Sequence, residues 1–304
     1  MIQLKVTNEF SPLKVVVLGT AKSNGPTPAL KDAYDPKSAE HIEAGTYPVE
    51  KDMVKEMEAV AAVFKKHGVT VYRPSTIEDY NQIFSRDIAF VIEDKFIIAN
   101  ILEDRSREIE ALQHVISKID PSKIIEFPEN AHIEGGDVMP HGDYIFVGTY
   151  YGEDYKSYIT ARTNIKAVKH LQTLFPHKKV KSFNLRKSNT IAQDNALHLD
   201  CCFQPIGKGK CIIHKEGFLI EEEYQWLVDY FGKENCFHID AMEMYYMNSN
   251  IFSISEDIII SEKSFTRLNT WLRSEGFTVE EVPYFEISKQ EGLLRCTTMP
   301  LIRE

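Results

Sequence analysis

The sequence predicts an α/β fold of five ββαβ repeats arranged radially around a centre, with pseudo-fivefold symmetry. A short strand pair, an amphipathic helix and a closing strand recur about every 45 to 65 residues, which indicates an array closed on itself. Two to four residues separate most strand pairs, the spacing of hairpins, whereas the crossovers of a doubly wound sheet need a dozen or more. No linker or low-complexity segment interrupts the 304 residues, so we expect one domain over 1–304.

The first repeat begins with a β-branched strand over 13–19. Its helix is predicted over 53–66 from apolar residues at helical spacing, with Gly68 suited to end it, and a closing strand follows over 69–72. The stretch 21–48 is rich in Gly, Pro and Ser. We expect it to be a long irregular loop and a candidate lid.

The other four repeats follow the same order. Their predicted strand pairs cover 88–92 with 96–99, 137–139 with 144–148, 197–203 with 211–213, and 250–254 with 258–260. Their predicted helices cover 105–119, 162–174, 222–231 and 264–273, and their closing strands 123–127, 180–183, 235–238 and 278–282. Side chains that meet at the centre of such an array come from equivalent strand ends, so polar residues there are the candidates for function.

The composition limits the classes of function. With 43% hydrophobic residues the chain can bury a large core, and its net charge of −10 argues against a nucleic-acid partner while tolerating a small cationic substrate. Five cysteines without a C-x-x-C pair predict neither a disulfide framework nor a zinc or redox site. The N-terminus lacks the apolar core of a signal peptide and no run of about 18 apolar residues exists, so we expect a cytoplasmic protein without a membrane partner.

Polar residues stand at the mouths of several predicted core strands. Asp87 precedes the second strand pair, and Glu134 stands before a double glycine at the third. At the fourth, His198 and Asp200 lie two residues apart, so they share one face if 197–203 is a strand. Cys296 lies in the last turn of the chain, which we expect at the end of the fifth repeat. Taken singly, each residue also fits a turn, a cap or a packing role.

A cysteine, a histidine and three carboxylates from different strand ends suit a guanidinium group as substrate. The group is planar and cationic and carries several N–H donors, which carboxylates bind in bidentate fashion. A thiolate is a nucleophile soft enough for its central carbon, and its pKa falls beside a bound cation. Histidine is the side chain best suited to protonate the leaving amine.

These motifs resemble those of the guanidino-group-modifying enzymes, which include arginine deiminases, dimethylarginine dimethylaminohydrolases and amidinotransferases. The resemblance covers nearly the whole chain. It rests on Asn-Glu-Phe-Ser-Pro-Leu-Lys at 8–14, His-Gly-Val-Thr-Val-Tyr-Arg-Pro at 67–74, Glu-Gly-Gly-Asp at 134–137, Arg-Thr-Asn at 162–164 and Gly-Leu-Leu-Arg-Cys at 292–296. The resemblance implies a five-bladed α/β propeller, in agreement with the repeat count.

The resemblance also implies a role for each candidate residue. Cys296 corresponds to the nucleophile that forms a covalent thiouronium intermediate, His198 to the general acid and later base, and Glu134 to the carboxylate that orients the histidine. Asp87 and Asp200 correspond to the pair that grips the guanidinium nitrogens. Arg162 is similar to an arginine that holds the α-carboxylate of the substrate, and it also fits a surface arginine at a helix start.

The motifs leave three functions open. The double glycine and the 162–164 run resemble the hydrolases, which favours hydrolysis of arginine or a close derivative to citrulline with release of ammonia or an amine. The opening strand and 69–74 resemble the amidinotransferases, so transfer to an acceptor amine is the alternative. A propeller that only binds a partner is the third reading, although it would need no cysteine, histidine and carboxylate set. No cofactor and no metal are implied, because His132, His141 and His198 lack the spacing of zinc ligands, and a homo-oligomer is possible.

Overall fold

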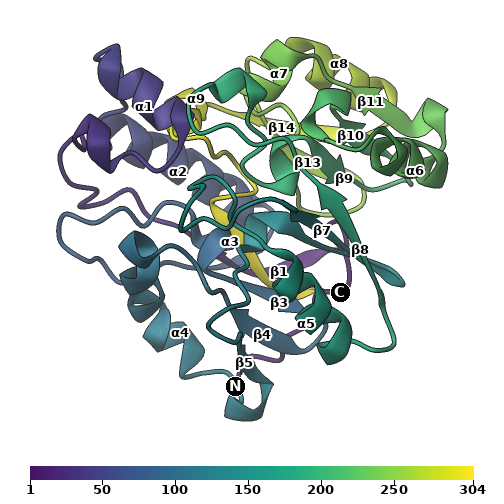
Figure 1. Cartoon of the computed structure of the whole chain (residues 1–304), viewed down its shortest axis with the longest axis horizontal. Helices are drawn as coiled ribbons and strands as arrows, with labels where there is room; N and C mark the ends of the chain where they lie inside the picture. The colour runs from purple at the N-terminus through teal and green to yellow at the C-terminus, as the bar shows by residue number, and fades with distance from the viewer.

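The computed structural model describes residues 1–304, in which fifteen strands form five three-stranded sheets (Figure 1). The strands are β1 Leu13–Leu18, β2 Thr70–Tyr72, β3 Ala89–Ile92, β4 Lys95–Ile98, β5 Ile124–Glu126, β6 Val138–His141, β7 Tyr144–Thr149, β8 Lys179–Asn184, β9 Phe203–Pro205, β10 Cys211–Ile213, β11 Cys236–His238, β12 Phe252–Ser253, β13 Ile258–Glu262, β14 Thr278–Val282 and β15 Thr298–Arg303. The strand orders are β15-β1-β2, β3-β4-β5, β6-β7-β8, β11-β10-β9 and β12-β13-β14. Each middle strand pairs antiparallel with one neighbour and parallel with the other, as a ββαβ repeat requires.

Four α-helices make the crossovers from a middle strand to its parallel neighbour: α2 Glu50–Lys66, α5 Ile165–Leu174, α6 Glu221–Phe231 and α8 Thr266–Ser274. They confirm four of the five predicted helices because the apolar residues at helical spacing do face the interior. The shorter helices are α1 Pro36–Glu43, α3 Ser85–Ile88, α4 Gln113–Ile116, α7 Ala241–Tyr245 and α9 Phe285–Ser288. Gly68 has a φ of +70° just after α2, the left-handed conformation for which glycine was expected there.

The predicted α-helix over 105–119 is wrong for most of its length. A 3₁₀ helix, η2, covers Glu103–Leu112, and only the single turn α4 follows it. Side chains three residues apart eclipse one another in a 3₁₀ helix. Arg105 and Glu108 use that geometry for a buried ion pair of 2.6 Å between Nε and Oε1.

The predicted strand over 197–203 is also wrong. Residues Leu199–Cys201 form a 3₁₀ turn, η6, and β9 starts only at Phe203. The backbone N–H of Leu199 donates to the Asp137 carboxylate at 2.9 Å, which draws this part of the chain toward the neighbouring repeat. His198 and Asp200 therefore do not share a strand face.

The stretch 21–48 is less irregular than expected. It contains a 3₁₀ turn, η1 Leu30–Asp32, and the two-turn helix α1. Asp35 caps α1 by accepting a hydrogen bond from the backbone N–H of Ser38 at 2.6 Å, and Pro36 occupies the first helical position. The Gly, Pro and Ser content of this stretch predicted a loop, although Asp35 and Pro36 are typical residues for the start of a helix.

The two ends of the chain share the first sheet, a feature that the repeat pattern did not predict. Strand β15 pairs antiparallel with β1, with Thr298 opposite Leu18, and so supplies the strand that the first repeat lacks. Cys296, which was expected at the end of the fifth repeat, instead stands at the mouth of the first sheet.

Three apolar clusters form the interior, and the largest contains 48 buried residues, Cys296 among them. The two smaller clusters centre on the second and third sheets. Burial of alternating strand residues against the crossover helices is the main stabilising term in such a fold. No helix in the structure combines the length and the apolarity needed to cross a bilayer.

Candidate active site

The candidate residues lie in short turns that immediately precede the first strand of each sheet. Asp87 lies in α3 before β3, Glu134 directly before a 3₁₀ turn (η4, Gly135–Asp137) that leads into β6, and His198 before η6 and β9. Cys296 stands two residues before β15 in the first sheet, and Asn250 two residues before β12 in the last. The five sheets thus each deliver one polar side chain, as expected of equivalent strand ends.

The histidine is held by a buried ion pair. His198 Nε2 lies 2.7 Å from Glu134 Oε2, and Glu134 is fully buried. Burial opposes the charged carboxylate, but Arg162 and His198 together hold the pKa of Glu134 well below its usual value. Burial likewise disfavours the imidazolium, yet Asp87 and Glu134 outweigh it and raise the pKa of His198. The histidine therefore keeps its proton to higher pH than a free imidazole, which suits it to act as an acid.

Asp87 presents one free carboxylate oxygen at the other side of the histidine. Its Oδ2 accepts from Arg105 at 2.9 Å, whereas Oδ1 has no hydrogen-bond partner and lies 3.9 Å from His198 Nδ1. The residue is only 3% exposed, and burial raises its pKa despite the positive charges nearby. A buried acceptor without a donor is costly unless a ligand satisfies it.

The thiol of Cys296 lies against an amide and a carboxylate. Asn250 Nδ2 approaches Sγ at 3.1 Å, while Asn250 Oδ1 accepts from the backbone N–H groups of Arg295 and Cys296 at 2.9 and 3.2 Å. Asp200 Oδ2 lies 3.6 Å from Sγ. Burial, followed by the negative charges of Asp200 and Asp87, raises the pKa of Cys296 well above its ordinary value. Without a bound cation the site therefore holds a neutral thiol.

Arg295 braces Asp200 from behind. Its Nη1 donates to Asp200 Oδ2 at 2.8 Å, and its Nε and Nη2 donate to the carboxylate of Glu9 at 3.1 Å. Burial opposes both ionised groups, but the pairing lowers the pKa of Glu9 to about 2 and raises that of Arg295. Asp200 Oδ1 receives only the thiols of Cys201 and Cys296, at 3.9 and 3.8 Å, so it keeps acceptor capacity on the cysteine side.

Arg162 lies outside the helix in which it was predicted. Asn164 caps α5 by accepting from the Ala167 N–H, so the helix begins three residues after Arg162. The buried guanidinium of Arg162 donates through Nη1 to Glu134 at 3.2 Å and through Nη2 to the carbonyl of Tyr34 at 2.6 Å. Arg162 thus joins the histidine side of the site to the segment 21–48.

The double glycine allows close contacts in the site. A Cβ on Gly136 would lie 2.7 Å from the imidazole of His198, and a Cβ on Gly135 would lie 2.0 Å from the Arg86 carbonyl oxygen. The paired glycines therefore allow the histidine ring and the neighbouring turn to approach closely.

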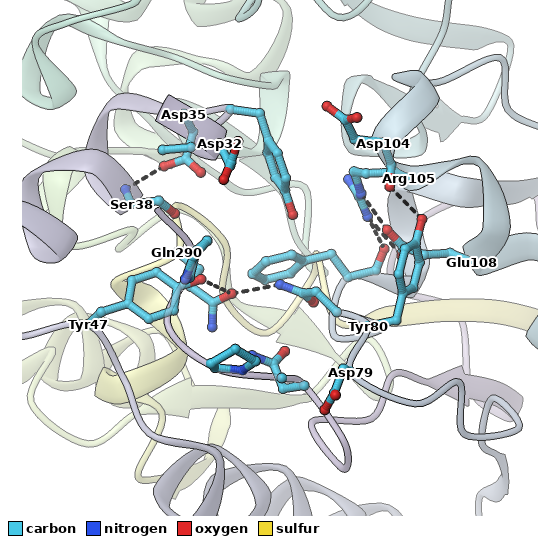
Figure 2. Close-up of a pocket in the computed structure, with 18 residues that line it drawn as sticks. Asp32, Asp35, Ser38, Tyr47, Asp79, Tyr80, Asp104, Arg105, Glu108 and Gln290 are labelled. Carbon is cyan, nitrogen blue, oxygen red and sulfur yellow. Dashed lines mark hydrogen bonds and ion pairs between the residues drawn. The ribbon is translucent and has the colours of Figure 1, made fainter. Parts of the chain in front are cut away.

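Two neighbouring cavities that share lining residues serve the site. A small inner one, of about 10 Å³, is lined by twelve residues that include Asp87, Arg162, His198 and Cys296. An outer one, of about 340 Å³, is shown in Figure 2. Both are lined by Tyr34, Asp35, Phe84, Arg105 and Gln290. Asp200 and Glu134 do not line the inner cavity, although Asp200 lies beside the Cys296 thiol and Glu134 beside the His198 ring, which do.

Asp87, Glu134 and His198 also bring potential metal-ligand atoms within 4.8 Å of one another. Arg105 already binds Asp87, and Arg162 already binds Glu134. Two guanidinium groups thus supply the positive charge that a metal ion would bring, so the donor set fits a metal poorly.

Sequence reasoning missed three residues with a direct effect on the site. Arg105 and Arg295 neutralise Asp87 and Asp200, and Asn250 contacts the thiol. Arg295 directly precedes Cys296, but nothing in the sequence shows which way its side chain turns. Asn250 could have been found by position, because it stands at the mouth of the fifth predicted strand pair, where the other repeats carry their candidates.

A family model described as N,N dimethylarginine dimethylhydrolase, eukaryotic, matches residues 34–303. The uncharacterized protein YkgA of Bacillus subtilis (strain 168) is 30% identical over 225 residues, which are 73% of this chain and 70% of that protein. Inosamine-phosphate amidinotransferase 1 of Streptomyces griseus is 40% identical over 82 residues, 24% of each chain.

Solved structures agree on the fold. The N-terminal domain of ArgZ, an arginine dihydrolase from the ornithine-ammonia cycle in cyanobacteria, has a TM-score of 0.78 at 16% identity and covers 95% of this chain and 97% of its own. The Streptomyces griseus amidinotransferase has a TM-score of 0.76 at 16% identity, over 100% of this chain and 97% of its own. Because the family model and YkgA both span most of the chain, the protein belongs to the N,N-dimethylarginine dimethylhydrolase family of the guanidino-group-modifying pentein superfamily.

Proposed function

We propose that this protein hydrolyses the guanidinium group of arginine or a close derivative, giving citrulline or its equivalent and ammonia or an amine. The observation that carries the proposal is the unpartnered Asp87 oxygen in the cavity that also exposes the Cys296 thiol and the His198 ring. A guanidinium ion supplies what this cavity lacks, a flat cation with several N–H donors. The names of the relatives, an arginine dihydrolase and a dimethylarginine hydrolase family, agree with this chemistry.

Binding of the cation creates the nucleophile. In this proposal Asp87 Oδ1 and Asp200 Oδ1 accept the guanidinium N–H groups on either side of the thiol. The positive charge next to Sγ offsets the burial and the carboxylate repulsion that raise the pKa of Cys296. The thiol proton leaves to solvent, and the thiolate attacks the guanidinium carbon.

His198 then moves the protons. It donates a proton to the leaving nitrogen as the carbon–nitrogen bond breaks, which leaves a thiouronium on Cys296 and a neutral imidazole. The imidazole accepts a proton from water as the water oxygen attacks the same carbon. Collapse of that adduct breaks the carbon–sulfur bond and releases the urea product. Glu134 fixes the ring throughout, and we propose that Arg162 serves by holding Glu134 and Tyr34.

Amidinotransfer is the second candidate, and two observations favour it. The 82-residue match to an amidinotransferase is the stretch of highest identity among the relatives reported above, and the outer cavity has room for an acceptor amine. Transfer shares the first half-reaction and differs only in what attacks the thiouronium.

One assay separates the two reactions. The protein is incubated with L-arginine, with and without glycine or lysine, beside Cys296→Ala, and citrulline, ornithine and ammonia are measured. Citrulline and ammonia without acceptor, absent in the variant, are the expected result. Ornithine that appears only with an acceptor would replace hydrolysis by transfer.

A second proposal concerns how the five sheets are arranged in the whole chain. We infer that the five sheets are the blades of one α/β propeller and that residues 1–304 act as a single catalytic domain. Support comes from the matching strand order in every sheet and from β15, which joins the end of the chain to its beginning.

A further inference from the structure

The fourth sheet brings two free cysteines together outside the candidate active site. Cys211 begins β10 and Cys236 begins β11, and the two residues are register partners in the parallel ladder between these strands. The Cys211 thiol donates a hydrogen bond to Cys236 Sγ at 3.5 Å. Neither residue lines either cavity beside the site. The pair is therefore separate from the residues that take part in the proposed reaction.

The backbone holds the two cysteines at a separation suited to a disulfide. Neighbouring strands lie about 4.7–4.9 Å apart, and a disulfide joins Cα atoms that lie about 4.4–6.8 Å apart. Because the sulfur atoms already lie 3.5 Å apart, side-chain rotation can bring them to the bond length of about 2.05 Å. No C-x-x-C pattern marks this pair in the sequence, since 25 positions separate the two residues and only the ladder joins them.

Cys236 is the thiol most open to a reagent. It is the only one of the five cysteines that is partly exposed, and its strand β11 forms an edge of the sheet (Figure 1). The hydrogen bond from Cys211 lowers the pKa of Cys236, although burial and the charge of Glu234 oppose this shift. Burial raises the pKa of each of the other cysteines, Cys201, Cys202, Cys211 and Cys296. Exposure and thiolate character together decide thiol reactivity, so exchange begins at Cys236.

We propose that Cys211 and Cys236 form a reversible disulfide by exchange with a small disulfide such as oxidised glutathione. The Cys236 thiolate attacks one sulfur of the reagent, whose sulfur–sulfur bond breaks and releases one small thiol. Cys211 then loses its proton to solvent and attacks the Cys236 sulfur of the mixed disulfide, which releases the second small thiol. Two protein thiols are oxidised and one small disulfide is reduced to two thiols. This site is independent of the function proposed above.

The bond fastens an edge strand to the rest of its sheet. It joins β11 to β10 and closes a loop of the chain that contains α6. The end of α6 is already tied to this place, because Cys236 Sγ donates to the Gly232 carbonyl at 3.3 Å. A cross-link restricts the unfolded chain more than the folded one, so the oxidised protein is the more stable form.

Peptide mapping after exchange tests which cysteines pair. The native protein is incubated with oxidised glutathione, its remaining thiols are blocked with N-ethylmaleimide in denaturant, and it is digested with trypsin. Cleavage after Lys215 and Lys233 places Cys211 and Cys236 in separate peptides. We expect these two peptides to be cross-linked and the free thiols to fall from five to three. Cys211 and Cys236 that both stay free, whether or not another cysteine reacts, would overturn the proposal.

Two single variants test the order of the steps by mass spectrometry. Cys236→Ser removes the exposed thiol, so exchange at Cys211 should be about tenfold slower than in the native protein. Cys211→Ser keeps the exposed thiol without its partner, so a mixed disulfide with glutathione should accumulate at Cys236.

The matched control is Cys202→Ser, in the turn before β9 of the same sheet. Cys202 is buried and its thiol contacts the Leu199 carbonyl, so its loss should leave the rate of cross-linking unchanged. Native rates of exchange in Cys236→Ser, or absence of the mixed disulfide in Cys211→Ser, would overturn the role of Cys236 as the attacking thiol.

The midpoint of thermal unfolding tests the consequence for the fold. Oxidation should raise the midpoint of the native protein by about 5 °C, and dithiothreitol should reverse the rise. The same treatment should leave the midpoint of Cys236→Ser where it is. A midpoint that falls on oxidation would mean that the bond strains the sheet, and it would overturn the stabilising role.

Discussion

The inner ring of the site and its outer entrance are built in opposite ways. The ring, formed by Asp87, Glu134, His198, Asn250 and Cys296, is buried, and each member stands in a turn fixed to the start of a strand. The entrance draws largely on the segment 21–48, whose residues are mostly half-buried or exposed. Buried ion pairs hold the ring, whereas the segment 21–48 is attached at the entrance by single hydrogen bonds such as that from Tyr47 Oη to Gln290. Changes to the ring should therefore abolish chemistry or folding, and changes to the entrance should alter only substrate selection.

Removal of the brace behind Asp200 should have the largest effect. Arg295→Met leaves the fully buried Asp200 and the nearly buried Glu9 without their shared cation. Breaking such a buried network costs about 3–5 kcal/mol, because Asp200 stays desolvated without a cation and Glu9 keeps only its longer pair with Arg86, at 3.8 Å. Chemical denaturation measures the loss in free energy of unfolding.

The matched control is Arg273→Met, which breaks a half-exposed pair with Glu281. That pair should contribute at most about 1 kcal/mol. Similar losses in free energy of unfolding in the two variants would mean that the buried ion pairs of the ring stabilise the protein no more than an exposed pair does. The contrast between ring and entrance would then be wrong.

Loss of the Glu134 charge beside His198 should shift the pH dependence of kcat. Although burial lowers it, the pKa of His198 is raised by Asp87 and Glu134, so the acid form persists to higher pH than in a free histidine and activity falls as pH rises through that pKa. Glu134→Gln removes one of these carboxylates, so the falling limb of kcat against pH should move to lower pH. At neutral pH kcat should fall about 10²-fold, because the general acid is lost.

The proton on His198 also makes the free energy of unfolding depend on pH. A raised histidine pKa means that the stabilisation from the His198 proton is complete below the unfolded pKa and is lost as pH rises through the folded one. In Glu134→Gln the free energy of unfolding should therefore depend less on pH on the alkaline side. Glu129→Gln, an exposed glutamate, should change neither profile. An unmoved kcat limb in Glu134→Gln would show that another group sets it.

Asn250→Ala should make the thiol harder to ionise. Burial and nearby carboxylates raise the pKa of Cys296, and the amide of Asn250 opposes them by donating to Sγ. Its loss should slow alkylation of Cys296 by iodoacetamide about tenfold at a fixed pH and move the midpoint of the rate profile to higher pH. Asn248→Ala, in the same turn and with an unpartnered side-chain oxygen, is the control. A slower rate with an unmoved midpoint would indicate only a displaced loop.

The sequence predicted the five repeats because alternating apolar strands and helical spacing are local properties. It also singled out the cysteine, the histidine and three carboxylates as candidates, because polar residues at strand mouths stand out against that pattern. The closure by β15 escaped prediction because its partner β1 lies at the other end of the chain. The turn at His198 escaped for a similar reason, since Asp137 holds it from another repeat. Asn250 escaped because an asparagine before a strand also suits an ordinary turn.

The smallest effect is expected at the entrance, from Tyr47→Phe. The Tyr47 hydroxyl donates to Gln290 Oε1 at 3.0 Å and so joins the segment 21–48 to the turn that leads to Cys296. A neutral hydrogen bond of this kind contributes about 0.5–1.5 kcal/mol, so kcat/KM should fall about two- to tenfold. Alkylation of Cys296 by iodoacetamide should keep its rate, because nothing in the ring has changed. Tyr151→Phe, an exposed hydroxyl away from both cavities, should leave kcat/KM as it is. A change in alkylation rate with Tyr47→Phe would mean that the entrance and the ring move together, and the division between chemistry and selection would not hold.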